Sequence, residues 1–433
     1  MEPERSQDAP PRSAVSAPVG IVGVIGLIGW TATASRFGLN GPFSALTALL
    51  ACGLPMIAWS LFVDKVHRNP TTGIDWSLRR PWREAIDGSL VKLAGLWATW
   101  GVIAFCYCIG RWYWSGSWLF AMHSLRALLP VLLILSAPYV LWLERRLIEP
   151  RDSLWAFGQW LLTLGRDPEV TRRALADHAR AWMVKGFFIA FMFSTLPGNW
   201  AAALTADPQR MLDDPVALAD GLIAIMFLID VNLATVGYLL TMRPLDSHIR
   251  SANPYAAAWM AALICYPPFI MMNPGGPLDY SPGQAPWSDW LTGHPMLLTL
   301  DAFALIALTG VYAWATMAFG LRFSNLTHRG ILTNGPYRFS KHPAYLAKNL
   351  FWWLSTMPFL ATTGLASDRI RNAAILAVIS GVYYWRARTE ERHLSADPVY
   401  RDYAEWMARH APVPRFFGAI ADRFRPARIQ AAE

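Results

Sequence analysis

GPYRFSKHPAYLAKNL, residues Gly335 to Leu350, is a dense polar stretch between two segments apolar enough to lie in a membrane. Its core, KHPAY, occupies residues 341–345, and beyond the next apolar segment the chain becomes polar again in RARTEERH at residues 386–393. Two clusters of charge therefore flank one helical hairpin. Because the surrounding sequence favours apolar side chains, these polar groups require a structural or functional reason.

The composition is that of an integral membrane protein. Of the 433 residues, 54% are hydrophobic and only 16% are charged, whereas about a quarter of a soluble protein is charged. Ten segments each supply the roughly 17 to 25 mostly apolar residues that a helix needs to cross a hydrocarbon core of about 30 Å. They are residues 18–35, 43–63, 91–110, 125–143, 183–204, 217–242, 255–272, 295–321, 345–363 and 370–385. We therefore predict an all-α, polytopic membrane protein with about ten transmembrane helices.

The distribution of Lys and Arg predicts the orientation of these spans. With the N-terminus inside, roughly 29 of the 38 basic residues fall in the N-terminal arm, the even-numbered loops and the C-terminal tail, and about five fall in the odd-numbered loops. The long segment 273–295 has no Lys or Arg and should face away from the cytoplasm. Both termini, the 335–350 loop and the 386–393 cluster are therefore expected on the cytoplasmic side, where a soluble cofactor could reach them.

The net charge of +8 does not indicate a nucleic-acid partner. The basic residues lie in short juxtamembrane loops, and no soluble basic domain exists to bind a duplex. Attraction to anionic lipid headgroups explains the excess better. The four cysteines, all within apolar segments, show neither a disulfide framework nor metal-ligand spacing, so no metal site is expected; they are Cys52, Cys106, Cys108 and Cys265.

Three regions are expected along the chain. Residues 1–17 are rich in Pro and Ser and should be disordered. Residues 18–294 form an N-terminal transmembrane region, whose inner segment 145–182 should carry two helices lying on the cytoplasmic leaflet. Residues 295–433 form a C-terminal membrane domain with a cytoplasmic loop and tail. In that tail, Asp397-Pro398 is a helix start, and the segment after the helix should break and fold back.

The loop at 335–350 carries signals of rigidity. Asn334-Gly335-Pro336 is strong turn chemistry, and Pro343 disfavours the helical conformation at His342. The loop should therefore present several polar side chains in fixed directions, namely Tyr337, Arg338, Lys341, His342 and Tyr345. Such a loop either binds a ligand or is an ordinary basic juxtamembrane loop with interfacial tyrosines.

Glu390 and Glu391 follow the last predicted span within a run of Arg and His. They are either a solvated face with an Arg386 to Glu390 pair one helical turn apart, or the binding site of a cationic group such as an ammonium. Because they lie on the same predicted face as the 335–350 loop, a shared pocket is the stronger hypothesis.

The order of these motifs resembles a known family. A Gly-x-Tyr lead-in, a basic-His-Pro-x-Tyr core, a hydrophobic hairpin, Glu-Glu and a downstream Tyr-x-x-Tyr look like the isoprenylcysteine carboxyl methyltransferase and phospholipid methyltransferase superfamily of membrane enzymes. The resemblance covers residues 322–417, about a quarter of the chain. It implies an enzyme that takes S-adenosyl-L-methionine from the cytoplasm and a lipid-like or isoprenoid acceptor from the bilayer.

The resemblance also implies roles for particular residues. His342, Pro343 and Tyr345 would contact the cofactor, and Glu390 and Glu391 would meet its amino group or ribose. Tyr400 and Tyr403 would help to close a lid. Gly335, Tyr337 and Arg338 match the lead-in, and Lys341 stands within the core of the motif.

Two other classes of function stay open. Membrane sterol reductases resemble this chain in having about ten spans, and they bind a nicotinamide dinucleotide in the corresponding place; Arg386, Arg388 and Arg392 could then meet a 2′-phosphate. A non-enzymatic transporter or assembly factor is the third possibility, because polar residues and prolines interrupt several spans.

Asp230 is the most prominent ionisable residue inside a span, near the middle of segment 217–242. An ionisable residue at that depth is a functional-site candidate, and a hydrogen bond between helices is its structural alternative. If the methyl acceptor is an amine or hydroxyl, a base is needed, and the candidates are His342, Glu390 and Asp230 in that order. The positive-inside pattern suits a bacterial inner membrane, and the sequence gives no indication of oligomeric state.

Overall fold

The computed structural model describes residues 9–412, and its regular structure is almost entirely helical. The helices are α1 (Ala17–Arg36), α2 (Pro42–Ala58), α3 (Trp82–Gly110), α4 (Leu119–Glu144), α5 (Ser153–Leu162), α6 (Arg172–Leu204), α7 (Pro208–Asp213), α8 (Pro215–Leu239), α9 (Ala256–Leu263), α10 (Trp287–Trp290), α11 (Pro295–Phe319), α12 (Pro343–Thr356), α13 (Ala366–Leu394) and α14 (Pro398–His410). Two short strands, β1 (Ser251–Ala252) and β2 (Thr327–His328), pair antiparallel.

Seven helices of the described chain are long and apolar enough to cross a membrane: α1, α2, α3, α4, α6, α8 and α11. They coincide with the first six predicted spans and the eighth. Large apolar side chains are exposed along them, including Ile25 at 63%, Phe105 at 65% and Ile134 at 71%. Apolar surface on this scale requires a lipid environment. The prediction of an all-α integral membrane protein is confirmed, whereas the number of ten spans is not.

The remaining three predicted spans take other forms. Residues 255–272 do not form a continuous helix: α9 is 8 residues long, and the chain beyond it is irregular as far as residue 286. Pro267 and Pro268 lack the backbone N–H groups that a helix would need there. Helix α12 has 14 residues, about 21 Å of helix, which is shorter than a hydrocarbon core. Helix α13 has 29 residues but is polar at both ends.

Segment 145–182, expected to lie on the cytoplasmic side, also differs from its prediction. Helix α5 forms where the first interfacial helix was expected, but it packs closely against α3. A Cβ built on Gly158 would lie 2.0 Å from the carbonyl oxygen of Val91, so this approach requires glycine. The second expected interfacial helix does not exist as a separate element. Its residues are the first turns of α6, which continues without a break for 33 residues.

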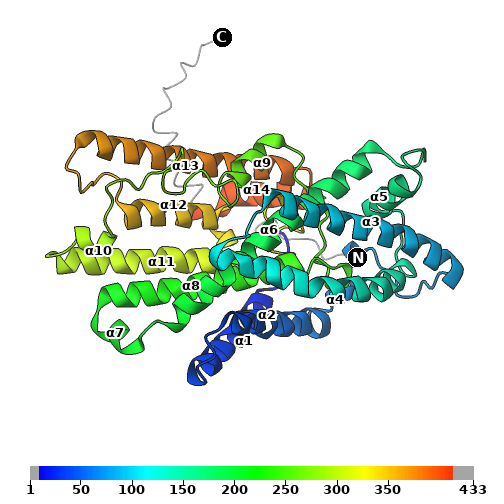
Figure 1. Cartoon of the computed structure of the whole chain (residues 1–433), viewed down its shortest axis with the longest axis horizontal. Helices are drawn as coiled ribbons and strands as arrows, with labels where there is room; N and C mark the ends of the chain where they lie inside the picture. Colours follow the sequence, from blue (N-terminus) through cyan, green and yellow to red (C-terminus); the bar gives the residue numbers. More distant parts are fainter. Residues whose placement is uncertain (1–8, 413–433) are drawn as a thin grey trace, which may run out of the picture.

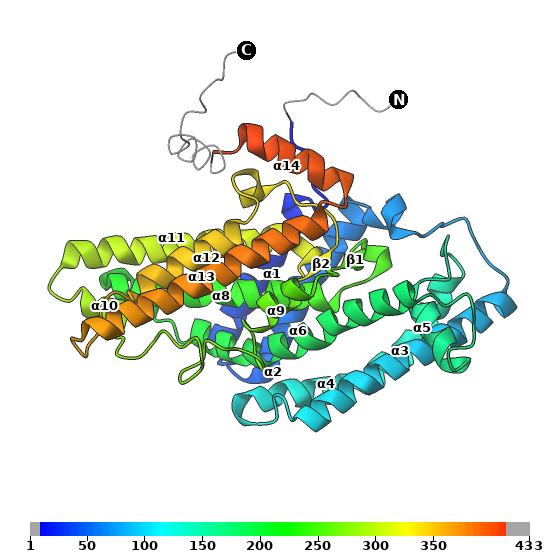
Figure 2. The same ribbon diagram turned by 90° about the horizontal axis from the view of Figure 1, so that it is seen from above.

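The helices form two groups that meet at helix α6. Figure 1 shows α13, α12, α11 and α8 as a layer of neighbouring helices, and each is in contact with the next. Helix α6 packs against α8, and the α1–α2 hairpin packs against α8 and α11. Helices α3, α4 and α5 form the second group, on the far side of α6 (Figure 2). The predicted regions 18–294 and 295–433 are therefore joined by the broad contact of α8 with α11.

Loops that the positive-inside pattern places on the cytoplasmic side contact one another. Ile74 pairs with Leu147, and β1 pairs with β2 in the register Ser251 with His328. The N-terminal arm joins the same layer: Ala14 N donates to Ile331 O at 2.8 Å, and Thr333 donates to Pro11 O at 2.6 Å. The part of the arm within the described residues is therefore ordered by these bonds, contrary to the predicted disorder. Residues 1–8 lie outside the described residues, as does the predicted fold-back of the tail beyond residue 412.

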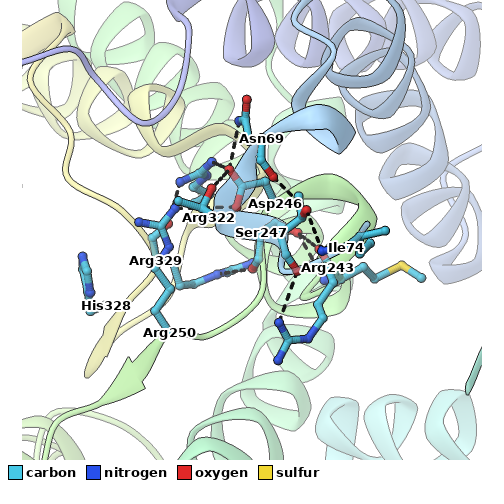
Figure 3. Close-up of polar contacts among 12 residues, drawn as sticks. Asn69, Ile74, Arg243, Asp246, Ser247, Arg250, Arg322, His328 and Arg329 are labelled. Carbon is cyan, nitrogen blue, oxygen red and sulfur yellow. Dashed lines mark hydrogen bonds and ion pairs between the residues drawn. The ribbon is translucent and has the colours of Figure 1, made fainter. Parts of the chain in front are cut away.

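A buried carboxylate, that of Asp246, organises these contacting loops. Asp246 is 1% exposed and accepts hydrogen bonds from Asn69 at 3.0 Å, Thr71 at 2.8 Å and Arg322 at 2.8 Å. The donors come from the loop after α2 and from the end of α11 (Figure 3). Arg250 contributes a longer ion pair at 3.6 Å. One side chain thus connects three segments that are far apart in the sequence.

Replacing Asp246 with Asn should lower the free energy of unfolding by about 3 kcal/mol or more, because it leaves the Arg322 guanidinium buried without its counter-charge. Thermal unfolding of the detergent-purified protein measures the effect. The exposed Asp213→Asn is the matched control and should change stability by less than about 0.5 kcal/mol. The double variant with Arg322→Met should recover part of the loss. Equal melting of the Asp246 and Asp213 variants would contradict the role given to Asp246.

Candidate functional site

The 335–342 loop has the rigid geometry that its sequence predicts. Residues Gly335–Arg338 form a 3-10 turn. Gly335 has φ +56°, and a Cβ at that position would lie 3.2 Å from Trp314 Nε1, so both its conformation and its contact with α11 favour glycine. His342, with φ −132° and ψ 56°, precedes Pro343 at the start of α12. The loop therefore ends at His342, which leads into α12 and contacts Glu391 of α13.

Glu391 of α13 holds this loop in place. Its carboxylate contacts Lys341 Nζ at 2.7 Å, His342 Nε2 at 3.1 Å and Arg388 at 3.1 Å. Partial burial by itself raises the pKa of Glu391, but the hydrogen bonds from His342 and Lys341 and the charge of Lys341 lower that pKa to about 2. Glu391 is thus an ionised clamp between the loop and α13.

Glu390, the next residue on α13, faces a different partner. Its Oε2 accepts a hydrogen bond from the Tyr345 hydroxyl at 3.0 Å. The rings of Tyr345 and His342 stack one turn apart, with centroids 5.6 Å apart and planes within 2° of parallel. The two motifs that the sequence places on either side of a hairpin therefore meet through Glu390 and Glu391.

Helix α14 covers the same loop from outside. As predicted, it starts at Pro398, with the Asp397 carboxylate accepting from Val399 N at 2.8 Å. The Tyr403 hydroxyl donates to the Tyr337 carbonyl at 2.6 Å, while Tyr400 is buried in the apolar contact of α14 with Ile331. The Tyr-x-x-Tyr pair thus fixes α14 over the loop, and neither tyrosine lines the pocket beneath it.

Beneath the loop lies a pocket of about 80 Å³. Five of the predicted site residues line it: Tyr337, Lys341, His342, Tyr345 and Glu390. The other lining side chains come mainly from the end of α11, the chain after α9, α12 and α13, and include Tyr266, Tyr312, Thr316, Asn325, Lys348 and Tyr383. A second cavity of about 20 Å³ shares Leu326, Tyr345 and Glu390 with it.

Not all predicted residues reach this pocket. Arg338 is exposed beside it and has no partner among the described residues. Pro343 and Gly335 shape the backbone without lining the pocket, and Glu391 lies behind Lys341 and His342. The pocket is therefore built around the middle of the motif and one of the two glutamates.

Asp230 lies behind the pocket wall. Asp230 is 8% exposed. Its carboxylate accepts hydrogen bonds from the hydroxyls of two residues of α11, Tyr312 at 2.9 Å and Thr316. Tyr312 and Thr316 both line the pocket, whereas Asp230 does not. Asp230 can therefore influence a ligand through Tyr312, and it also makes the hydrogen bond between helices that was its structural alternative.

Two cations beside the pocket were not recognised in the sequence as partners of one site. Lys348 places its ammonium 5.6 Å from the ring centroid of Tyr312, 5.2 Å from Trp352 and 5.7 Å from Tyr383. The Arg386 guanidinium lies 5.1 Å from the Tyr345 ring and 4.8 Å from Tyr383. The spacing of Lys348 and Arg386 along two helices gives no signal that they converge, because that depends on how α12 packs against α13.

The three arginines considered for a 2′-phosphate point to different places. Arg386 is buried among tyrosines, Arg388 binds Glu391, and Arg392 lies over the ring of Tyr255 at 4.2 Å. They do not form one cluster.

Comparison of the chain with protein-family models, curated proteins and solved structures finds no match. Function is therefore inferred from the side chains of the pocket.

The clamp predicts a specific pH dependence of stability. Because the pKa of Glu391 in the folded chain is depressed from 4.5 to about 2, its carboxylate stabilises the fold above pH 4.5, and this contribution is lost as the pH falls toward 2. The difference in melting temperature between the natural protein and Glu391→Gln should be constant from about pH 7 to 5 and shrink below about pH 4.5.

Glu405→Gln on α14 is the control, because the Glu405 side chain is 71% exposed. It should alter the melting temperature little at any pH. A Glu391→Gln difference that persists unchanged down to pH 3 would mean that the carboxylate is not an ionised clamp.

Proposed function

We propose that this chain is an integral membrane methyltransferase that uses S-adenosyl-L-methionine and acts on a lipid-like or isoprenoid acceptor. The observation that carries the proposal is the meeting of the two sequence motifs around one pocket. Glu391 binds Lys341 and His342, and Glu390 binds Tyr345. A merely basic juxtamembrane loop has no need of such specific contacts with α13, the helix that follows α12.

The chemistry of the lining suits the cofactor. Glu390 offers a carboxylate to an ammonium group, and several tyrosines offer rings and hydroxyls to a nucleoside. The cavity of about 80 Å³ is smaller than the roughly 300 to 1,000 Å³ of typical ligand pockets. Binding therefore requires the pocket to open, and the Tyr345–Glu390 hydrogen bond, which lies between the two cavities, is the contact that must yield.

When bound, S-adenosyl-L-methionine supplies an activated methyl group on a sulfonium sulfur. The task of the protein is to position the acceptor atom in line and to exclude water. The aromatic lining from Tyr266, Tyr312 and the buried Tyr383 provides such a water-poor environment. For a carboxylate or thiolate acceptor, positioning is sufficient.

An amine or hydroxyl acceptor needs a base as well. The proposed order is His342, Glu390 and Asp230. His342 and Glu390 line the pocket directly, while Asp230 can receive a proton only through the hydroxyls of Tyr312 and Thr316 that bond to it. The acceptor enters from the bilayer and the cofactor from the cytoplasm, with both termini inside and the bacterial inner membrane as the location that fits the charge pattern.

Calorimetric titration of the detergent-purified protein with S-adenosylhomocysteine and, separately, with NADPH tests the proposed function. We expect S-adenosylhomocysteine alone to bind. Glu390→Gln keeps an acceptor for the Tyr345 hydroxyl but removes the charge, and should weaken binding by about tenfold or more. Glu405→Gln should leave it unchanged.

The other outcomes separate the competing functions. Binding of NADPH without S-adenosylhomocysteine would replace the proposal with a reductase of a sterol- or enone-type lipid. Binding of neither would favour a non-enzymatic transporter or assembly role. Binding of S-adenosylhomocysteine that is indifferent to Glu390→Gln would place the cofactor elsewhere.

The role of Asp230 is tested by Asp230→Asn and Tyr312→Phe. If the acceptor needs a base at this end of the pocket, both variants should bind S-adenosylhomocysteine normally but lower methyl transfer by about 100-fold, the scale of general base catalysis. Incorporation of labelled methyl groups into lipids extracted from the expressing cells provides the readout. Thr316→Val, which removes the other hydroxyl donor to Asp230, should have the smaller effect on transfer. Full transfer by both variants would leave Asp230 a structural residue.

A further inference from the structure

Arg386 of α13 is a buried cation without a matching anion. The residue is 4% exposed, and no carboxylate oxygen of the described chain lies within 4.0 Å of its guanidinium. Its Nη2 donates to Asn325 Oδ1 at 3.2 Å, while the buried Nη1 has no hydrogen-bond partner among the described residues. Since a guanidinium does not lose its proton in a protein, this charge is permanent.

Aromatic contacts compensate Arg386 only in part. Its guanidinium lies 5.4, 5.1 and 4.8 Å from the ring centroids of Tyr266, Tyr345 and Tyr383. Such cation–π contacts are individually modest, and removing a charge from water costs more than they return unless hydrogen bonds and an opposite charge are also supplied. The free Nη1 is therefore the sign of a missing anionic partner.

The guanidinium lies at the border of the pocket. Arg386 lines the smaller cavity, which shares Leu326, Tyr345 and Glu390 with the larger one. Asn325, to which Arg386 donates, lines the larger cavity. A ligand that occupies both cavities would reach Arg386 once the Tyr345–Glu390 contact opens.

Arg386 and Glu390 stand one turn apart on the same helix but are not paired with each other. Glu390 instead accepts from Tyr345. Two opposite charges at this spacing, about 5 to 6 Å between Cβ atoms, suit a ligand that carries both an ammonium and a carboxylate on one carbon. Lys348, which also lines the pocket, lies over aromatic rings and forms no ion pair with a carboxylate of the described residues; it adds to the attraction for the anionic group.

We propose that Arg386 binds the α-carboxylate of an amino-acid moiety, with Glu390 binding the ammonium group beside it. This inference rests on the proposed function: the ligand is S-adenosyl-L-methionine, and Arg386 binds its amino-acid end. Of the three arginines near the two glutamates, only Arg386 is buried, and its Nη1 has no partner within the part of the chain that the structure describes. The role is a binding role, and Arg386 takes no part in methyl transfer itself.

The test compares S-adenosylhomocysteine with its decarboxylated analogue, which keeps the adenosine, the sulfur and the amino group. By calorimetry, the natural protein should bind S-adenosylhomocysteine about 10- to 100-fold more tightly than the analogue. Arg386→Gln should bind the two compounds with similar affinity. Arg392→Gln, an exposed arginine on the same helix, is the matched control and should keep the natural preference.

Each result has a defined meaning. Equal affinity of the natural protein for both compounds, or a preference that survives in Arg386→Gln, would overturn the role of Arg386 and leave the proposed function intact. Failure of the natural protein to bind S-adenosylhomocysteine would end the proposed function and this inference with it. If Arg386→Gln does not fold, Arg386→Lys takes its place and should keep part of the preference, because it retains the charge but not the planar pair of donors.

Discussion

The ion pair between Asp246 and Arg322 is the constraint on which the loop side of this structure that carries β1, β2 and the 335–342 loop depends. Both side chains are almost fully buried, and a buried charge is tolerated only when it is paired and hydrogen-bonded. Because Arg322 lies in the 3-10 turn directly after α11 and Asp246 follows α8, the pair fixes the ends of the two helices with the broadest mutual contact. The paired strands β1 and β2 follow Asp246 and Arg322 closely in the chain.

The candidate site uses buried charge in two different ways. Glu391 is surrounded by Lys341, His342 and Arg388, so its charge is neutralised within the protein and its function is to hold the loop. Arg386, on the same helix, has no carboxylate partner among residues 9–412. Adjacent turns of α13 therefore serve distinct purposes: one closes the structure, and the other leaves a charge available to a ligand. Asp230 fits neither kind: both of its oxygens accept hydrogen bonds from hydroxyls of α11, and no ion pair with a described residue accompanies them.

Membrane helices were the most predictable part of the fold because lipid imposes a simple rule on sequence. A continuous run of apolar residues was enough to locate α1, α2, α3, α4, α6, α8 and α11. The rule failed at residues 255–272, where apolar composition was satisfied but Pro267 and Pro268 cannot continue a helix. It also failed to locate the start of α6, because polar turns precede the apolar span and hydropathy alone would begin the helix later. Hydropathy measures the preference of residues for lipid and does not measure where a helix begins.

The sequence by itself determined the membrane class, the alternation of basic and neutral loops, and the pairing of the KHPAY loop with Glu390 and Glu391 as parts of one hypothetical site. Each of these is encoded locally, in runs of residues or in short motifs. Only the tertiary structure decided that Lys348, Tyr266, Tyr312 and Tyr383 converge on the pocket, that Arg386 lines the smaller cavity beside it, and that Asp230 lies behind its wall. These residues come from α8, α11, α12, α13 and the chain after α9. Their proximity depends on how distant helices pack, and no local pattern in the sequence carries that information.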